Sequence, residues 1–403
     1  MYAMEANVSK YTNAIGSGKQ TITQRQKRKG GRGMREGWEY KKLGEVCDIY
    51  QPKTLATEQL VADGKYYVYG ANGIIGRYND YNHEQSEILL TCRGATCGTI
   101  NISQPYSWIN GNAMVIHRKS EDLSFDFLKY LMLSLDYSLI ITGAAQPQIT
   151  RQKIAPIIVK FPSLSVQQSI VSELDKINEL ISLKKEQLKD YDNLAQSIFY
   201  EMFGDPVENE KGWEVKKLIE TVVLECTISY GIVQPGDGVE DGIPVVRPID
   251  LTGTFVSTNN LKKTTEKISS SYSRTILTGK ELLVCVRGTT GVCSLVTDEL
   301  KGCNVTRGIT PLLFNDNTDR WFMYYQFQMP QIKCIIADYT KGITLKQINM
   351  ADFRKIPVIL PPLPLQQLFA QRIELIEKQK AEVQQTIADL ETLLASRMQY
   401  WFD

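Results

Sequence analysis

Histidine is scarce in this sequence: 403 residues contain only His83 and His117. Histidine is the side chain most often used for acid–base chemistry and metal binding near neutral pH. The phosphate-binding pattern Gly-x-x-x-x-Gly-Lys-Ser/Thr is also missing, since Gly279-Lys280 is followed by Glu281. No Asn-Pro-Pro-aromatic loop of the kind used by amino-methyltransferases occurs either. We therefore expect no catalytic residue, no metal site and no cofactor in this chain.

Long apolar runs and paired cysteines are missing as well. No stretch approaches the ~18 to 20 apolar residues of a membrane span, and no apolar signal-peptide core is found near the N-terminus. None of the eight cysteines forms a Cys-x-x-Cys pair. We expect a cytoplasmic protein with buried free thiols and no membrane partner.

Charge is unevenly distributed along a chain whose net charge is +1. Residues 1–33 hold seven Lys or Arg and one Glu, a charge of +6, which leaves −5 on the rest. These residues have no apolar periodicity, so we predict a disordered basic extension with Met34 as the natural start; a basic arm lying on phosphates is the alternative. Nucleic-acid binding by the rest of the chain would require local basic patches.

Two sequence patterns occur twice. Gly-Trp-Glu-Tyr-Lys-Lys-Leu at 37–43 returns as Gly-Trp-Glu-Val-Lys-Lys-Leu at 212–218, an offset of 175 residues. Leu-Ser-Val-Gln-Gln at 164–168 returns as Leu-Pro-Leu-Gln-Gln at 363–367, an offset of 199 residues. The chain is therefore a tandem duplication, with 24 extra residues inside the second globular part.

Heptad spacing follows each copy of the second pattern. The apolar steps of 4 and 3 residues are interrupted by Lys184 in the first copy, and the second copy keeps the same register with its own polar interruptions. Two ordinary helices packed on their own domains are the alternative. The residues predicted to pair the two helices are Ile170, Leu174, Ile177, Ile181, Leu188, Ile373, Ile376, Val383, Ile387, Leu390 and Leu394.

The predicted order along the chain is globule, helix, globule, helix, and the two halves are equivalent. Such a chain closes most simply around a pseudo-twofold axis, with the long helices antiparallel. We predict an α+β protein whose two similar, mainly β globules are joined by these helices. A spacer helix of 35 residues (166–200) would be ~52 Å long. The predicted division is an extension at 1–33, globules at 34–162 and 207–361, and long helices at 163–206 and 362–403.

Short apolar runs predict the elements within each globule. Helix is expected over 125–141 in the first, and over 319–337 with an interruption at Pro330 in the second. The predicted strands are 66–69, 87–91, 113–116, 243–246, 281–286 and 311–314.

The two repeated framework motifs, the two variable globules and the long helices together resemble the specificity subunit of type I restriction-modification systems over residues 34–403. The segments Thr-Cys-Arg-Gly-Ala-Thr-Cys-Gly at 91–98 and Cys-Val-Arg-Gly-Thr-Thr-Gly at 285–291 resemble target recognition domains of that family. The resemblance implies a noncatalytic reader in which each domain binds half of a bipartite, asymmetric site on double-stranded DNA. It also implies two methyltransferase subunits docked on the helices, with restriction and translocase subunits joining them. S-adenosylmethionine, ATP and Mg²⁺ are then expected on those partner subunits.

Candidate DNA contacts follow from side-chain chemistry and turn-rich surroundings. Arginine can grip guanine or a phosphate with two hydrogen bonds, and a neighbouring glycine permits close approach; a structural salt bridge is the alternative. Several tyrosines (66, 67, 69, 324 and 325) could stack on a base, although core packing is the better prediction. The candidates are Arg93, Arg287, Arg77, Asn112, Gln148, Arg247, Arg307 and Gln347.

Three other functions stay open on the sequence alone. The chain could supply specificity to a related nuclease-methyltransferase system that has no separate translocase. A protein-only coiled-coil scaffold would have the same repeats and heptads. A self-contained enzyme is the third possibility, against the missing motifs.

Overall fold

The computed structural model describes residues 37–143, 145–236, 238–342 and 346–403. The predicted basic extension at 1–33 lies outside these residues. The chain forms two compact units. Unit 1 holds the described residues up to Lys185 together with Gln385–Asp403, and unit 2 holds Glu186–Gln384. Each unit thus contains one globule and half of each long helix. Among the described residues, no helix is both long enough and apolar enough to cross a bilayer.

The Gly-Trp-Glu-x-Lys-Lys-Leu repeats form the strand that opens each globule. In the first globule, β1 (Glu39–Lys42) pairs antiparallel with β9 (Ile158–Phe161), directly before the first long helix. In the second, β10 (Glu214–Lys217) pairs in the same way with β19 (Pro357–Leu360). The leucine that ends each motif, Leu43 or Leu218, is fully buried. The repeated motif therefore ties the beginning of each globule to its end.

Besides the β1-β9 pair, the described part of the first globule contains two sheets and a few short helices. An antiparallel sheet has the order β2-β8-β5-β6, and a second sheet has the order β4-β3-β7 with β3 and β7 parallel. The strands are β2 (Cys47–Tyr50), β3 (Tyr66–Gly70), β4 (Gly73–Tyr78), β5 (Ile88–Thr91), β6 (Ile100–Ile102), β7 (Trp108–Ile109) and β8 (Ala113–Arg118). The helices are α2 (Leu43–Val46), α3 (Phe125–Ser134) and α4 (Arg151–Ile154).

The prediction of helix over 125–141 is wrong beyond Ser134. The backbone becomes extended at Leu135. Asp136 then accepts a hydrogen bond from the Ser138 amide and begins a separate 3-10 turn, Tyr137–Leu139. An aspartate that can cap a new turn competes with continued helix, and the apolar pattern alone did not reveal it.

The second globule repeats this plan with an insertion. Its sheets have the orders β12-β11-β15, with β11 and β15 parallel, and β14-β13-β16, and β17 and β18 form a separate two-stranded sheet. The strands are β11 (Ile243–Val246), β12 (Lys262–Thr264), β13 (Leu282–Cys285), β14 (Cys293–Leu295), β15 (Asn304–Val305), β16 (Ile309–Leu312), β17 (Thr340–Lys341) and β18 (Gln347–Ile348). The helices are α6 (Glu266–Ser271), α7 (Arg320–Gln328), α8 (Pro330–Tyr339) and α9 (Met350–Phe353).

Three predictions about this globule can be placed on the structure. Pro330 interrupts the helical region, as expected, because it begins α8 after the extended residue Met329. Most of the extra length lies between β11 and β13, where residues 247–281 replace the shorter segment 71–87 between β3 and β5. The strand expected at 311–314 instead runs from Ile309 to Leu312.

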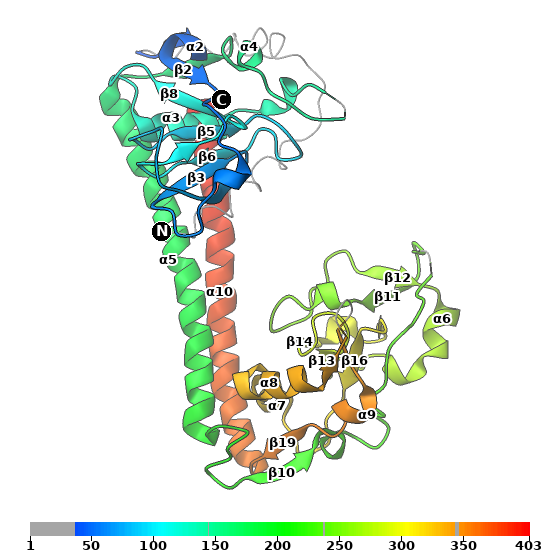
Figure 1. The fold of residues 1–403 in the computed structure, drawn as a ribbon. Helices are drawn as coiled ribbons and strands as arrows, with labels where there is room; N and C mark the ends of the chain where they lie inside the picture. Colours follow the sequence, from blue (N-terminus) through cyan, green and yellow to red (C-terminus); the bar gives the residue numbers. More distant parts are fainter. Residues whose placement is uncertain (1–36, 144, 237, 343–345) are drawn as a thin grey trace. The chain divides into compact units, whose positions relative to one another are not determined.

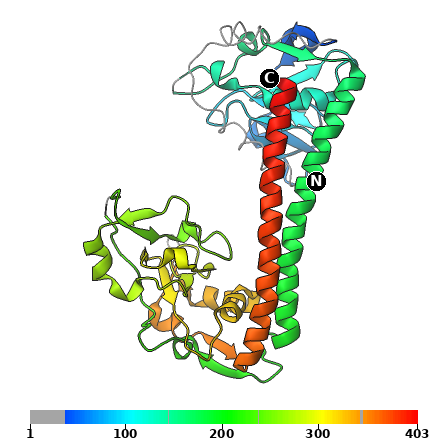
Figure 2. The same cartoon turned by 180° about the vertical axis from the view of Figure 1, so that it is seen from behind.

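The long helices α5 (Leu164–Phe203) and α10 (Leu363–Phe402) lie side by side and antiparallel within each unit (Figure 1, Figure 2). In unit 1, Lys185 Nζ lies 2.8 Å from Glu391 Oε1, and the Arg397 guanidinium is paired with Glu173. In unit 2, Lys380 Nζ lies 2.8 Å from Asp192 Oδ1. Nine of the eleven predicted pairing residues are buried, and Leu188 and Leu390 are half-buried.

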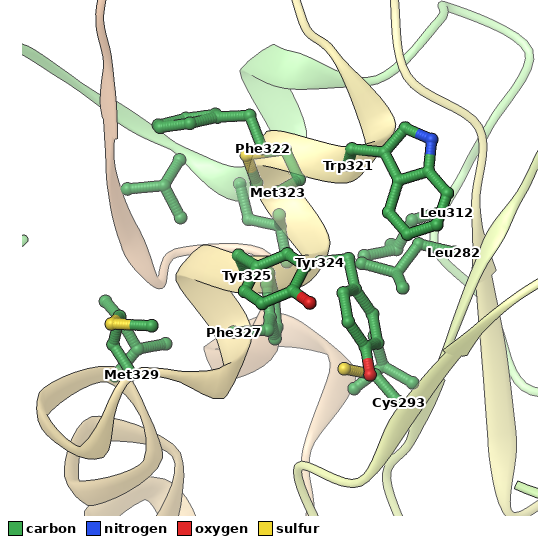
Figure 3. Packing of buried hydrophobic residues seen from close by; sticks show 14 of the residues in the cluster. Leu282, Cys293, Leu312, Trp321, Phe322, Met323, Tyr324, Tyr325, Phe327 and Met329 are labelled. Carbon is green, nitrogen blue, oxygen red and sulfur yellow. The ribbon is translucent and has the colours of Figure 1, made fainter. Parts of the chain in front are cut away.

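Each globule packs on the last turns of the other repeat's long helix. In unit 1, the Phe127 ring of α3 contacts Phe402 at a centroid separation of 5.3 Å. In unit 2, the Phe322 ring of α7 contacts Phe203 at 4.8 Å, within the large apolar core part of which Figure 3 shows. This exchange is what a pseudo-twofold arrangement of the repeats predicts. It is also why the compact units divide at positions inside the two helices.

A buried glutamine fixes the start of each long helix to its globule. Gln167 accepts a hydrogen bond from the Ser124 amide at 2.8 Å and donates to the carbonyls of Asp122 and Pro162 at 2.8 and 2.9 Å. Gln366 does the same with the Asp319 amide (2.9 Å) and the carbonyls of Asn317 and Pro361 (3.2 and 2.7 Å). The second pattern repeated in the sequence therefore has a structural role. Ser124 and Asp319 cap α3 and α7, so one side chain joins two helix starts.

The buried glutamines predict a measurable loss of stability on truncation. Gln167→Ala or Gln366→Ala leaves one amide and two carbonyls of the buried backbone without a partner, and should reduce the free energy of unfolding by about 1–3 kcal/mol. The measurement is urea denaturation of the full chain. The neighbouring Gln168 and Gln367 are exposed, so Gln168→Ala and Gln367→Ala are matched controls. Equal losses in variant and control would show that the buried amides are dispensable.

The polar interruption of the second helix is the buried Lys380, which lies in an ionic cluster. Lys380 Nζ is 2.8 Å from Glu377 Oε1 as well as from Asp192, and Glu377 also accepts a hydrogen bond from the Tyr325 hydroxyl at 3.0 Å. Burial lowers the pKa of Lys380, but the hydrogen bonds to Asp192 and Glu377 outweigh this and leave the pKa above its usual value. At the equivalent positions of the first copy, 199 residues earlier, stand Ile181 and Asn178.

This cluster predicts that one substitution lowers the stability of the protein and that a second substitution restores it. Lys380→Ile strands the Glu377 carboxylate, whose side chain is only 10% exposed, and should cost about 3–5 kcal/mol of stability. Adding Glu377→Asn restores the pair found in the first copy, where Asn178 donates to the Tyr130 hydroxyl at 3.0 Å. Urea denaturation should show the double variant at or above wild-type stability. A single variant as stable as wild type would contradict the assignment.

Candidate nucleic-acid interface

An Arg-Gly turn follows strand β5 in the first globule. The Gly98 amide donates to the Thr91 carbonyl at 2.9 Å and closes the turn. Gly94 and Gly98 have φ of +90° and +98°, a backbone conformation that residues with a Cβ atom rarely adopt. Arg93 is exposed at the start of this turn, and a Cβ added to Gly94 would meet nothing within 4 Å. The turn thus presents a cation beside open backbone.

A second loop is hydrogen-bonded to this turn. Thr142 and Gln148 exchange backbone hydrogen bonds of 2.9 and 2.8 Å across a narrow loop. The Gly94 amide donates to the Pro147 carbonyl, and the Ile149 amide to the Cys92 carbonyl, both at 3.0 Å. Arg93 and Gln148 are consequently paired through their backbones, although 55 positions separate them in the sequence.

The second globule holds the same arrangement. The Gly291 amide donates to the Cys285 carbonyl at 2.8 Å, and Gly288 and Gly291 both have φ of +87°. The Gly288 amide donates to the Lys346 carbonyl at 2.8 Å, and the Ile348 amide to the Val286 carbonyl at 3.0 Å. Arg287 is paired with Gln347 as Arg93 is with Gln148. We call this arrangement the paired-loop element, formed by the described residues of 91–98 with 142–149 and of 285–291 with 340–348.

A third loop joins each element and differs between the globules. In the first, the Cys92 thiol donates to the carbonyl of the exposed Asn112 at 3.2 Å. In the second, the Val286 amide donates at 2.8 Å to the carbonyl of Gly308, the residue after the exposed Arg307. Six of the eight candidate residues are therefore gathered into two equivalent clusters. Three come from each globule.

The remaining two arginines already have partners within the protein. The Arg77 guanidinium donates to the Gly64 carbonyl at 3.1 Å and lies 4.3 Å from the centre of the Tyr67 ring. Arg247 binds Asp250 through two guanidinium hydrogen bonds of 3.0 and 2.9 Å, which raise its pKa. Both side chains are held in place, so DNA contact would require either one to exchange or share a partner.

Both paired-loop elements are basic, a feature that reasoning from single residues missed. The segments 91–98, 142–149, 285–291 and 340–348 contain no aspartate or glutamate. The second element contains three cations; the first contains one, and two more follow it directly in the chain. Among the described residues none of these six lies in a salt bridge. The basic residues close in sequence to Gln148 and Gln347 were the signal that could have revealed this feature. The cations are Arg93, Arg151 and Lys153 in the first globule, and Arg287, Lys341 and Lys346 in the second.

Three of the tyrosines and both histidines are packed against or hydrogen-bonded to other groups of the protein. Tyr69, Tyr324 and Tyr325 are buried, which agrees with the prediction of core packing. His83 receives a hydrogen bond from the Tyr50 hydroxyl at 2.9 Å, and burial lowers its pKa. His117 lies 2.9 Å from the buried Glu87, whose pKa burial raises. The described part of the chain contains no cluster of three or more His, Cys, Asp or Glu placed to hold a metal ion.

The cysteines are all free, as predicted, but not all are buried. Burial raises the pKa of Cys47 and Cys293 to about 12, which makes these thiols unreactive at neutral pH. Cys97 and Cys226 are half-buried. Cys334 is exposed on α8, so the expectation of burial is wrong for that residue.

Comparisons with known proteins agree on one family. The family model described as "Type I restriction modification DNA specificity domain" matches residues 35–190 and 211–392. The EcoBI specificity subunit of Escherichia coli is 22% identical over 55% of this chain and 44% of its own length. A type I specificity subunit of Mycoplasma pneumoniae is 24% identical over 83% of this chain and 87% of its own length.

Solved structures show the same fold. The S subunit of a type I restriction-modification system from M. genitalium has a TM-score of 0.55 at 14% identity, covering 93% of this chain and 98% of that one. A chain from a structural study of type I complex assembly and conformational transition has the same TM-score at 19% identity, covering 91% and 98%. Two family domains, one over each repeat, place the chain in the type I restriction-modification DNA specificity family.

Proposed function

We propose that this chain reads a split DNA target, with each globule binding one half. The observation that carries the proposal is the paired-loop element, present once in each globule on an equivalent frame and basic in both. A chain whose net charge is −5 outside residues 1–33 needs such local basic patches to bind a polyanion. Two distinct sites on one chain suit two half-sites.

The two half-sites should differ in sequence. The loops near the two elements are not alike, since Asn112 stands beside one and Arg307 beside the other. Residues 247–281 also give the second globule a longer insertion, which contains α6. Asparagine suits adenine and arginine suits guanine in the major groove. A bipartite, asymmetric target is expected, in contrast to the palindrome of a homodimer.

The long helices would set the spacing between the half-sites. Each has 40 residues, or about 60 Å of helix at 1.5 Å per residue. This length is sufficient to span one turn of B-DNA, about 34–36 Å. The buried apolar residues between the helices would keep that spacing fixed.

The same helices would dock two methyltransferase subunits, one on each unit. Six leucines on the helices are between 43% and 66% exposed and are therefore available for apolar contact with a partner. A methyltransferase subunit docked on the helices would cover them. They are Leu180, Leu183 and Leu393 in unit 1, and Leu194, Leu368 and Leu375 in unit 2.

Chemistry belongs to the partners in this proposal. The chain would be noncatalytic, because its sequence lacks the phosphate-binding and methyltransferase motifs named above. S-adenosylmethionine would bind the methyltransferase subunits, and ATP and Mg²⁺ the restriction and translocase subunits. A complex without a separate translocase would use this chain in the same way.

Methylation sequencing tests the two-headed function. Cells expressing this chain with its genomic partner methyltransferase should carry adenine methylation at one split motif. Replacing the first globule, 37–162, with that of another specificity subunit should change one half of the motif only. The control is the same methyltransferase without this chain. If methylation by an active methyltransferase is unchanged without the chain, the proposal is wrong, and a protein-only scaffold becomes the better account.

Docking on the helices gives a separate prediction. Leu375→Asp puts a charge where an apolar contact is expected, and should weaken binding of the methyltransferase subunit at least ~10-fold, since burying a leucine contributes about 1.5–3 kcal/mol. Gln371 is exposed on the same helix, so Gln371→Asp is the matched control. Calorimetric titration of the purified subunits gives both affinities. Equal affinities for Leu375→Asp and wild type would remove this face from the docking surface.

A further inference from the structure

The two paired-loop elements are alike in the residues that they present, although they belong to globules with different surfaces. Arg93 and Arg287 begin turns with the same hydrogen bonds, and Gln148 and Gln347 stand opposite them. Residues that are identical in two reading heads cannot tell two different half-sites apart. Whatever these residues bind must therefore be common to both halves of the target.

The sugar-phosphate backbone is the part of DNA that every half-site shares. Phosphate contacts position a protein on the duplex without carrying sequence information. The first element offers Arg93, the second offers Arg287, Lys341 and Lys346, and neither contains a carboxylate. Gly94 and Gly288 have open space where a Cβ would be, so a phosphate can approach the protein backbone closely there.

We propose that the paired-loop element of each globule is a sequence-independent anchor that binds a DNA phosphate through Arg93 or Arg287. This inference rests on the proposed DNA-reading function and assigns the two best-placed arginines to positioning. Sequence discrimination then falls to residues outside the element, where the globules differ. The cations in and next to each element supply local positive charge on a chain whose net charge is negative outside residues 1–33.

Backbone positioning and base reading predict different mutant behaviour. Arg93→Ala or Arg287→Ala removes one phosphate-binding side chain and should weaken binding to cognate and scrambled duplexes by the same factor, on the order of 10-fold. Each substitution should reduce the slope of log K against log salt by about 1. Arg93→Lys and Arg287→Lys keep the charge and should retain most of the affinity and the recognised motif. An arginine that reads guanine would lose its bidentate hydrogen bonds on change to lysine.

The experiment is fluorescence anisotropy on the purified complex of this chain with its methyltransferase, over a series of salt concentrations. Methylation sequencing of the same variants records the motif. Lys189 is an exposed cation on α5 outside both globules, so Lys189→Ala controls for a general effect of net charge. Thermal melting of each variant establishes that it is folded.

The outcomes separate this inference from the function on which it rests. Equal weakening on cognate and scrambled DNA, with the motif unchanged, supports the anchor. A relaxed or altered base at one position of one half-site makes the arginine a base reader and overturns the inference, while the DNA-reading function stands. Wild-type affinity in both alanine variants, or the same weakening in Lys189→Ala, also overturns it. If the wild-type complex itself does not distinguish cognate from scrambled DNA, the proposed function fails.

Discussion

The structure depends on one hydrogen-bonded side chain in each repeat, the buried glutamine at the start of each long helix. Gln167 links the carbonyl that precedes α5 to the amide and carbonyl at the start of α3. These groups lie where a strand ends and two helices begin, so their backbone polar atoms have no partner within regular structure. A single buried amide satisfies them together. The direction of the long helix relative to its globule is thereby fixed, and Gln366 repeats the solution.

The two repeats solve the contact between the helices in different ways. Unit 1 buries Ile181 where unit 2 buries the Lys380 cluster, and an ion pair between the helices is found in both. A buried charge is costly unless it is paired, so the second seam is tolerant of few single changes. Duplicated frames therefore need not stay interchangeable. Lys380 and Glu377 each make the other costly to remove alone.

Local patterns in the sequence predicted much of the fold. The heptads predicted two long helices because a continuous apolar stripe depends only on neighbouring turns. The repeated motifs indicated equivalent globules in the same way. The end of α3 was missed because the cap offered by Asp136 outweighs an apolar pattern that continues past it. The position of the insertion was equally hidden, since nothing in residues 247–281 states which strands flank them.

The candidate site shows where such reasoning reaches its limit. Arg93 and Gln148 were chosen separately by residue type, and no spacing rule brings together residues so far apart in the chain. Their pairing depends on hydrogen bonds between a turn and a loop. No local pattern in the sequence indicates these hydrogen bonds. Arg247 met the same chemical criteria, yet its guanidinium is bound to Asp250.

A duplicated protein also gives an internal comparison that a single domain lacks. Positions that coincide in geometry and residue type, such as Arg93 with Arg287, report on what both heads must do. Positions that coincide in geometry but differ in side chain, such as those around Asn112 and Arg307, report on what each head does alone. In the proposed function, the first set would be constrained by the shape and charge that all duplex DNA has in common. The second set would be free to vary with the bases. Affinity and specificity could then change independently, because residues of different loops would carry them.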